Sequence, residues 1–145
     1  MTSIIFRTAT RYMFPPMLVF SVYEGTTKID ASEGRIVDTR FADAIREIAS
    51  GKAWGAMDIT EPNAGSDMAA LRAVGEQDED GNWLVTGQKI FITSGHGRWH
   101  FVIARTEEVK GEDAFAGLKG LSMFLVPAYE VDEQGNKRWL STIDG

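Results

Sequence analysis

The apolar and polar positions divide the chain into a helical segment followed by a series of short strands. The clearest helix is predicted over Asp38–Ser50. Three apolar side chains share one face at helical spacing there, Phe41, Ile45 and Ile48. Gly51 stands where a left-handed C-terminal cap belongs, and Asp38 or Thr39 is expected to cap the N-terminus. Residues 1–37 give no clean period.

After Lys52 the pattern changes to short apolar runs separated by turn residues, which favours strands. The expected strands are Trp54–Thr60, Ala73–Gln77, Trp83–Ile92, Trp99–Thr106, Leu121–Val126 and Arg138–Ile143. The loop Asp78–Asn82 predicts a hairpin, Val109–Lys119 a polar loop, and Pro127 is expected to stop the buried strand before it. The predicted class is therefore α+β, with a helical piece preceding an antiparallel β-barrel or sandwich.

Two further features of the pattern concern burial. The strand at Trp99–Thr106 alternates in a way that predicts one face more polar than the other. The four tryptophans are interpreted as core residues: Trp54, Trp83, Trp99 and Trp139.

Composition narrows the function classes. The 145 residues carry a net charge of −6, which argues against nucleic-acid binding, because that needs clustered Lys and Arg. There are no cysteines, so disulfides and thiolate metal sites are excluded. The uncharged stretch Tyr12–Tyr23 is broken by two prolines and is too short to span a bilayer.

The N-terminal residues allow two interpretations. Arg7 and Arg11 precede the first acidic residue, Glu24, which is typical of a mitochondrial transit peptide. A buried helix–loop segment explains the same composition equally well.

One loop carries candidate chemistry. An apolar run ends in Thr60 and is followed by a turn in which Pro62 fixes φ and Gly65 tolerates positive φ. Such a turn can aim successive N–H groups at one place, and Thr60 and Ser66 add hydroxyls. The alternative is a plain surface turn capped by Asp67.

A second apolar run, Lys89–Gly97, ends in the same kind of residues. Taken alone it also fits a core strand with Phe91 and Thr93 on one face. If the two runs converge, hydroxyls and N–H groups meet the edge of a planar ligand and an aromatic ring meets its face.

Together the two runs resemble the signatures of the acyl-CoA dehydrogenase family. Thr60–Asp67 reads Thr-Glu-Pro-Asn-Ala-Gly-Ser-Asp against the family's Thr-Glu-Pro-x-Ala-Gly-Ser-Asp. Gly87–Gly95 reads Gly-Gln-Lys-Ile-Phe-Ile-Thr-Ser-Gly against Gly-x-Lys-x-Trp-Ile-Thr-Asn-Gly. The resemblance extends from Phe41 to about Ile143. It implies a remnant of an N-terminal helical domain over 1–52 and an incomplete β-barrel middle domain over 53–145, with the C-terminal helical bundle missing.

The resemblance implies FAD as cofactor, no metal, and no catalytic residue within the chain. The implied FAD contacts are Met57, Asp58, Ile59, Thr60, Gly65, Ser66, Phe91, Ile92 and Thr93. Thr60 would donate toward the pyrimidine end of the flavin, Phe91 would face its ring, and Thr93 would lie near N5. Ser66 would also touch the acyl-CoA.

Several residues depart from the family pattern. Phe91 stands where most members have Trp, and Ser94 where many have Asn. The family's catalytic Glu lies in a C-terminal domain, so the Tyr-Glu-Gly-Thr string around Glu24 is interpreted as a chance similarity. His96 and His100 are four residues apart, but a turn leading into a strand separates them, and no third metal ligand is evident.

The expected function is that of a fragment of a flavin-dependent acyl-CoA dehydrogenase that forms a 2-enoyl-CoA, inactive as an isolated chain. Acyl-CoA and electron-transfer flavoprotein are the expected partners, and the full-length protein is expected to be a homo-oligomer. The expected location is the bacterial cytoplasm, in preference to the mitochondrial matrix. The alternatives are a non-catalytic β-domain that binds a nucleotide or a partner protein, and a same-fold acyl-CoA oxidase or flavin monooxygenase.

Overall fold

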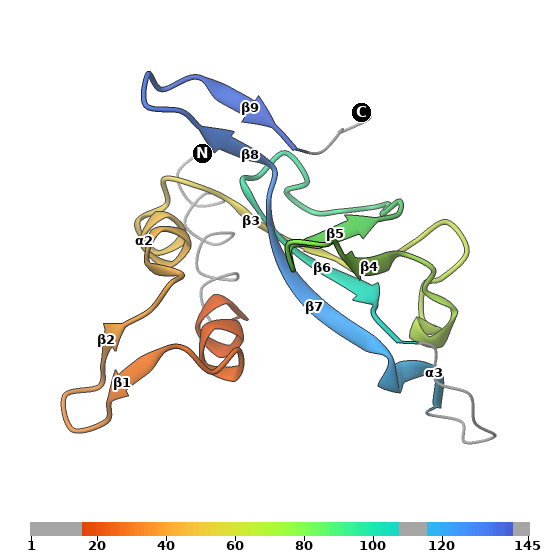
Figure 1. Cartoon of the computed structure of the whole chain (residues 1–145), viewed down its shortest axis with the longest axis horizontal. Helices are drawn as coiled ribbons and strands as arrows, with labels where there is room; N and C mark the ends of the chain where they lie inside the picture. The colour runs from red at the N-terminus through yellow and green to blue at the C-terminus, as the bar shows by residue number, and fades with distance from the viewer. Residues whose placement is uncertain (1–15, 108–115, 141–145) are drawn as a thin grey trace, which may run out of the picture. The chain divides into compact units, whose positions relative to one another are not determined.

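The computed structural model describes residues 16–107 and 116–140 (Figure 1). The chain divides into two compact units. The first unit is Met1–Gly55 with His96–Trp99, and the second is Ala56–Gly95 with His100–Gly145.

The first unit contains a helical segment at 16–23, the antiparallel strands β1 (Lys28–Asp30) and β2 (Arg35–Asp38), and the helix α2 (Ala42–Ser50). Its apolar interior includes Met17 and Ile48, which are fully buried. Residues 96–99 belong to this unit through Glu47, whose carboxylate accepts hydrogen bonds from the Arg98 guanidinium and, at 2.9 Å, from Trp99 Nε1.

The helix α2 begins later than predicted. Phe41 occupies the N-cap position without a side-chain hydrogen bond, so the expected cap at Asp38 or Thr39 is wrong. Asp38 is instead the last residue of β2, and Thr39 Oγ1 accepts from the Phe41 N–H at 3.2 Å. The left-handed cap at Gly51 is confirmed, with φ of 74°.

The second unit is built on a mixed five-stranded sheet, and the predicted α+β class is confirmed. Its strands are β3 (Gly55–Asp58), β4 (Val74–Gln77), β5 (Trp83–Thr86), β6 (Trp99–Arg105) and β7 (Leu121–Pro127). They run in the order β3-β6-β4-β5, with β7 also paired to β6. The β4–β6 pair is parallel and the β4–β5 hairpin is antiparallel.

Shorter elements complete the second unit. They are the 3₁₀ turn η1 (Met68–Ala70), the helix α3 (Ala116–Lys119) and the strands β8 (Tyr129–Val131) and β9 (Lys137–Trp139). The helix α3 takes the end of the segment Val109–Lys119, which was predicted as a loop, and the rest of that loop, 109–115, lies outside the described residues. A small apolar cluster of Ala64, Leu71 and Ile103 packs η1 and the loop after β3 against β6.

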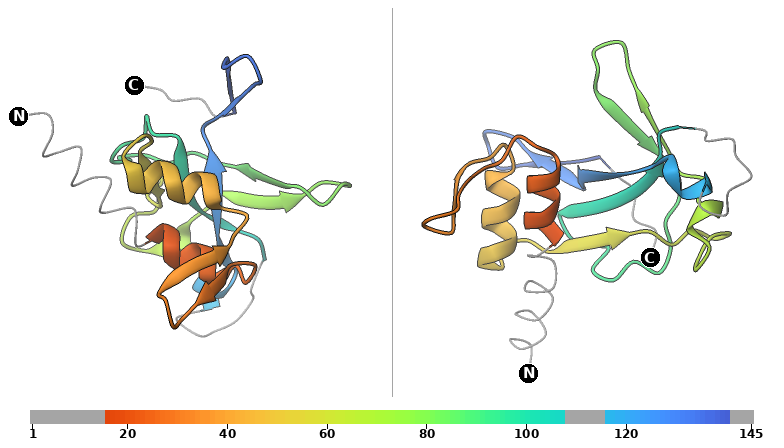
Figure 2. Two further views of the ribbon diagram at one scale, coloured as in Figure 1. Left: turned by 90° about the vertical axis from the view of Figure 1, so that its left-hand side faces the viewer. Right: turned by 90° about the horizontal axis from the view of Figure 1, so that it is seen from below.

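The two hairpins are closed by loops of the same construction. In the β4–β5 loop, Asp78 Oδ1 accepts from the N–H of Asp80 and of Asn82 at 3.0 and 2.8 Å. In the β8–β9 loop, Asp132 Oδ1 accepts in the same way from Gln134 and Asn136 at 3.0 and 2.7 Å. The β4–β5 hairpin extends away from the remaining strands of its sheet (Figure 2).

The predicted strand Trp83–Ile92 ends at Thr86, and this is the main correction to the strand assignment. At Gly87 the backbone passes so close to Ala73 that an added Cβ would lie 2.5 Å from the Ala73 Cβ. Further on, Phe91 and Ser94 adopt left-handed φ values of 57° and 61°. These values turn the chain, whereas a strand needs extended backbone.

Three burial predictions are also wrong. The strand β6 has no polar face, because it lies between β3 and β4, and its five central residues are buried. The strand β7 is half-buried and includes Pro127. Trp83 and Trp139 lie on the hairpins with 47% and 54% exposure, and their rings pack on Phe124 and Tyr129.

Candidate functional site

The two signature loops lie side by side in the second unit. The Ile90 N–H donates to the Thr60 carbonyl at 2.9 Å. One residue earlier in each loop, Lys89 Nζ donates to the Ile59 carbonyl at 3.1 Å. Residues thirty positions apart in the sequence are therefore joined by one backbone hydrogen bond and one side-chain hydrogen bond.

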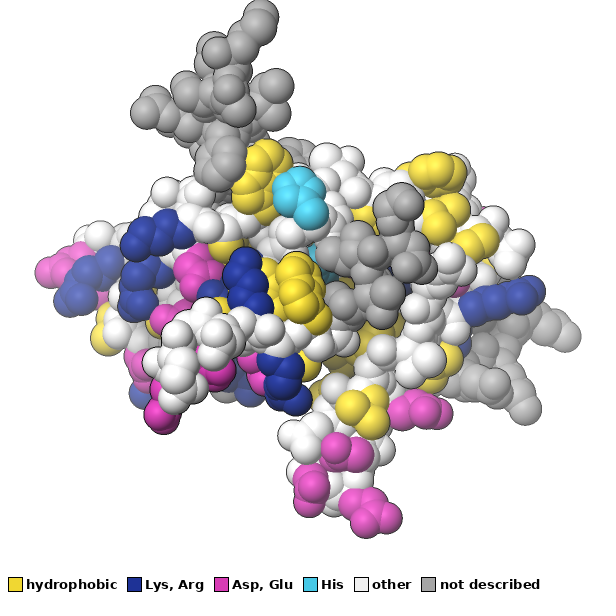
Figure 3. All heavy atoms as spheres, turned by 90° about the horizontal axis from the view of Figure 1, so that it is seen from above, with side chains coloured by type: hydrophobic (Ala, Val, Ile, Leu, Met, Phe, Trp, Pro, Cys, Tyr) yellow, Lys and Arg dark blue, Asp and Glu magenta, His cyan; other side chains and the backbone are white. Residues whose placement is uncertain are grey.

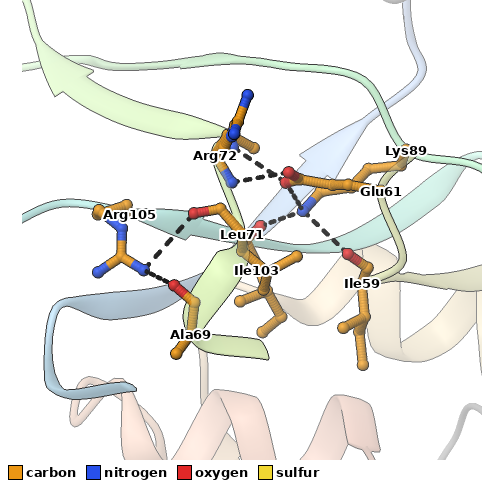
Figure 4. A network of polar contacts seen from close by, with 9 residues as sticks. Ile59, Glu61, Ala69, Leu71, Arg72, Lys89, Ile103 and Arg105 are labelled. Atoms are coloured by element: carbon orange, nitrogen blue, oxygen red, sulfur yellow. Dashed lines mark hydrogen bonds and ion pairs between the residues drawn. The ribbon is translucent and has the colours of Figure 1, made fainter. Parts of the chain in front are cut away.

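Lys89 is the centre of a buried polar network (Figure 4). Its ammonium lies 2.8 Å from Glu61 Oε1 and 2.6 Å from the Ile103 carbonyl, in addition to Ile59. The side chains of Lys89 and Glu61 are only 9% and 6% exposed. One cation thus links the loop after β3, the segment after β5, and the strand β6.

Glu61 extends this network to the segment before β4. Its two carboxylate oxygens accept from the N–H groups of Arg72 and Ala73 at 2.7 and 2.9 Å. Burial by itself raises the pKa of Glu61, but the hydrogen bond from Lys89 and these two N–H groups outweigh it and hold the pKa below its ordinary value. Glu61 is therefore a structural anion that stays ionised at neutral pH.

Arg105 fixes the η1 turn that follows the first loop (Figure 4). Its Nη2 donates to the carbonyls of Ala69 and Gly117 at 3.0 Å each. The carboxylate of Asp67 accepts from the Ala69 N–H at 3.0 Å, which caps the turn. The end of the Gly65–Ser66–Asp67 segment is thereby held in place.

The second loop presents a side chain of unusual exposure, and we call Phe91–Thr93 the ledge. Phe91 is 89% exposed and has left-handed backbone, although an exposed aromatic ring at positive φ is unfavourable on both counts. Such strain is typical of residues that serve a ligand. Thr93 beside it is also exposed.

Three hydroxyls of the predicted site have no hydrogen-bond partner within residues 16–107 and 116–140. They belong to Thr60, Ser66 and Thr93. Gly65 is exposed, and an added Cβ there would meet nothing within 4 Å. Donor groups and open backbone are thus available to a bound molecule.

A cavity of about 730 Å³ lies in the second unit beside the ledge. Of the nine predicted contact residues, Asp58, Phe91 and Ile92 line it. The other six do not: Met57, Ile59, Thr60, Gly65, Ser66 and Thr93. The predicted site therefore combines part of a cavity wall with the exposed residues Ser66 and Thr93 and the half-buried Thr60.

Asp58 is paired with a residue that the sequence interpretation left aside. Its Oδ2 lies 2.8 Å from His100 Nδ1, and both residues are buried. His96 belongs to the first unit, where its ring lies 5.4 Å from that of Trp54. Among the residues that the structure describes, no group of three His, Cys, Asp or Glu is arranged to hold a metal.

Sequence reasoning assigned no role to Lys89, Glu61 or His100. Lys89 and Glu61 stand inside the two signature strings, so the signal was present as a motif but carried no spatial information. His100 lies outside both strings, and only the pairing of β3 with β6 brings it to Asp58.

The comparison with known families decides the identity of the chain. The family described as "Acyl-CoA dehydrogenase, middle domain" matches residues 56–141. This chain belongs to the acyl-CoA dehydrogenase family.

Individual acyl-CoA dehydrogenases agree with the assignment. The chain is 35% identical over 120 residues to 3-methylmercaptopropionyl-CoA dehydrogenase of Ruegeria pomeroyi, covering 79% of this chain and 20% of that protein. It is 41% identical over 92 residues to the broad-specificity linear acyl-CoA dehydrogenase FadE5 of Mycobacterium tuberculosis, covering 59% and 14%. Butyryl-CoA dehydrogenase from Megasphaera elsdenii is a structural neighbour with a TM-score of 0.50 and 26% identity, covering 61% of this chain and 23% of that one.

The chain spans a fifth or less of the length of these two curated acyl-CoA dehydrogenases. FAD is the cofactor of the family. No helix among the described residues is long and apolar enough to cross a membrane. On the face drawn in Figure 3, Lys and Arg side chains are interspersed with Asp and Glu side chains.

Proposed function

We propose that this chain supplies the flavin-binding surface of a FAD-dependent acyl-CoA dehydrogenase. The observation that carries the proposal is the hydrogen bond of 2.9 Å from Ile90 to the Thr60 carbonyl, because it joins the two signature loops. The domain division into 1–52 and 53–145 and the nine contact residues are part of the same proposal.

The residues present fit a flavin. Phe91 offers an exposed aromatic face, which stacks favourably on a planar ring system. Thr60 and Thr93 carry hydroxyls without partners among the described residues, and these suit the polar edge of the isoalloxazine. Ser66 and Gly65 offer a hydroxyl and open backbone to a pyrophosphate, and Ser66 would also contact the acyl-CoA.

When bound, FAD supplies hydride acceptance at N5, which together with removal of the α-proton converts an acyl-CoA to a 2-enoyl-CoA. The role of this chain is to orient the flavin. A fixed donor at Thr60 favours the form of the flavin that carries more negative charge at its pyrimidine edge. Phe91 covers one face of the ring and excludes water from it.

We infer that this polypeptide alone does not turn over acyl-CoA. The two buried carboxylates near the proposed site are already engaged, Asp58 by His100 and Glu61 by Lys89. Glu24 in the first unit is bound to Thr26 and Arg40. A dehydrogenase assay that finds normal turnover by this chain would overturn the inference.

The proposed partners are acyl-CoA and an electron-transfer flavoprotein. One structural neighbour, with 29% identity and a TM-score of 0.50, is described as an electron transferring flavoprotein of Acidaminococcus fermentans. We further propose a homo-oligomer for the full-length protein. Relatives include bacterial and mitochondrial enzymes, and the bacterial cytoplasm is the location we favour.

FAD titration of the purified chain tests the proposal. Quenching of flavin fluorescence is expected, and Ser66→Ala and Thr93→Val should each weaken binding about 3- to 10-fold, the value of one net hydrogen bond. Thr86→Val makes the same chemical change at an exposed position of β5 outside the site and should leave binding unchanged. No quenching by the unmodified chain, or equal binding by all variants, would refute the proposal.

A further inference from the structure

Asp58 and His100 form a carboxylate–imidazole pair, and both residues lie outside the two signature strings Thr60–Asp67 and Gly87–Gly95. Asp58 is the last residue of β3 and stands two positions before Thr60, while His100 lies near the start of β6. Their side chains meet at 2.8 Å, and each residue is 8% exposed. The pair therefore joins two strand ends directly beside the proposed flavin surface.

The pair and the ledge share one cavity. Asp58 and His100 line it together with Phe91, Ile92 and Gly95. Any change in the position of the imidazole alters the wall to which the ledge also contributes. The pair is thus placed to act on the ledge.

The composition of the pair argues against a role in stability alone. Asp58 Oδ1 is buried and has no hydrogen-bond partner within the part of the chain that the structure describes. A buried carboxylate oxygen without a partner is destabilising and uncommon. Apolar residues of similar size would often serve packing as well or better. The polar pair therefore points to a role in geometry.

Lys89, two residues before the ledge, is bonded to Ile59, Glu61 and Ile103. Between Lys89 and His100, two residues have left-handed backbone φ, Phe91 and Ser94. A segment with such strained backbone keeps its conformation only where its surroundings over-determine it.

We propose that Asp58 and His100 are positioning residues, whose hydrogen bond holds the Phe91–Thr93 ledge in the arrangement that binds flavin. The inference rests on the proposed function, since it assumes that the ledge faces FAD. Asp58 is also one of the nine proposed flavin contacts, whereas His100 is not.

Two substitutions of His100 separate hydrogen bonding from packing. His100→Phe keeps the volume of the ring and removes the hydrogen bond. His100→Asn loses volume but keeps an N–H donor near the position of Nδ1. If the hydrogen bond positions the ledge, His100→Phe weakens FAD binding about tenfold or more and changes the visible absorption of the bound flavin, whereas His100→Asn stays within about threefold of the unmodified chain. A packing role produces the reverse order.

The chain with FAD added is the test system, and circular dichroism and thermal melting accompany each titration. Glu130→Gln on β8 is the control, because Glu130 pairs only with Arg138 among the described residues and lies outside the proposed site. Should His100→Phe fail to fold, His100→Leu removes the same bond with a smaller apolar side chain and leaves every proposed flavin contact in place. FAD binding equal to that of the unmodified chain in a folded His100→Phe or His100→Leu variant overturns this inference and leaves the proposed function standing. Failure of the unmodified chain to bind FAD overturns the proposed function itself.

Discussion

Lys89 Nζ lies 2.8 Å from Glu61 Oε1, and this buried ion pair joins the two loops that carry the family signatures. The pair is surrounded by backbone groups that complete its hydrogen bonding, with the carbonyls of Ile59 and Ile103 on the cation and two N–H groups on the anion. Full satisfaction of this kind makes a buried pair tolerable, but removal of one partner leaves an uncompensated charge.

Replacing Lys89 by Met is therefore expected to lower the free energy of unfolding by about 3–5 kcal/mol. Urea denaturation followed by circular dichroism measures the change. Lys52→Met alters an exposed lysine and should change stability by less than about 0.5 kcal/mol. The double variant Lys89→Met/Glu61→Met should recover part of the loss, because it no longer buries a lone carboxylate. Equal losses for Lys89→Met and Lys52→Met would contradict the structural role of the pair.

The pKa of Glu61 predicts a dependence of stability on pH. Because its folded-state pKa lies below the ordinary 4.5, the stabilisation is fully present above about pH 4.5 and is lost as the pH falls further through the lowered value. Glu61→Gln removes this titration, so the stability difference between the two proteins should shrink from pH 7 toward pH 3.5. Urea midpoints over that range provide the measurement. Glu79→Gln on the exposed hairpin loop is the matched control, and a difference for Glu61→Gln that does not change with pH would refute the prediction.

Phe91 predicts a conflict between stability and binding. Its left-handed backbone is disfavoured by about 1 kcal/mol or more for a residue with a Cβ, and its exposed ring gains little from packing. Phe91→Gly should raise the free energy of unfolding by about 1 kcal/mol while weakening FAD binding. Gln88→Gly makes the corresponding change at an exposed neighbour without left-handed backbone and should not stabilise the chain. A loss of stability in Phe91→Gly would show that the ring is packed in solution.

Each of the two hairpin loops is expected to stabilise only its own hairpin. The pKa of Asp132 is lowered, first by the hydrogen bond from the Asn136 side chain, and Asp78 has the same arrangement with Asn82. Asp132→Ala should speed amide hydrogen exchange in β8 and β9 and leave β4 and β5 unchanged, and Asp78→Ala should do the opposite. Faster exchange in both hairpins of either single variant would mean that the loops are not independent.

Local sequence patterns predicted most strands of the second unit and the end of the helix α2 in the first. Apolar runs bounded by turn residues predicted β3, β4 and the start of β5, and Gly51 correctly predicted the end of α2. These features depend on neighbours within a few positions, which the sequence displays directly. The end of β5 was missed, because the apolar run through Ile92 reads as a strand until the close approach of Gly87 to Ala73 and the turn at Phe91 are known.

The sequence alone was enough to indicate the family and the two loops, because Thr60–Asp67 and Gly87–Gly95 are contiguous motifs. It did not indicate the polar bonds that hold those loops. Lys89 finds Glu61 across 28 positions and His100 finds Asp58 across 42, and no local pattern encodes which partner a side chain meets after folding. Burial decides these pairings, because a charged or polar group withdrawn from water must take the partner that the packed strands bring to it.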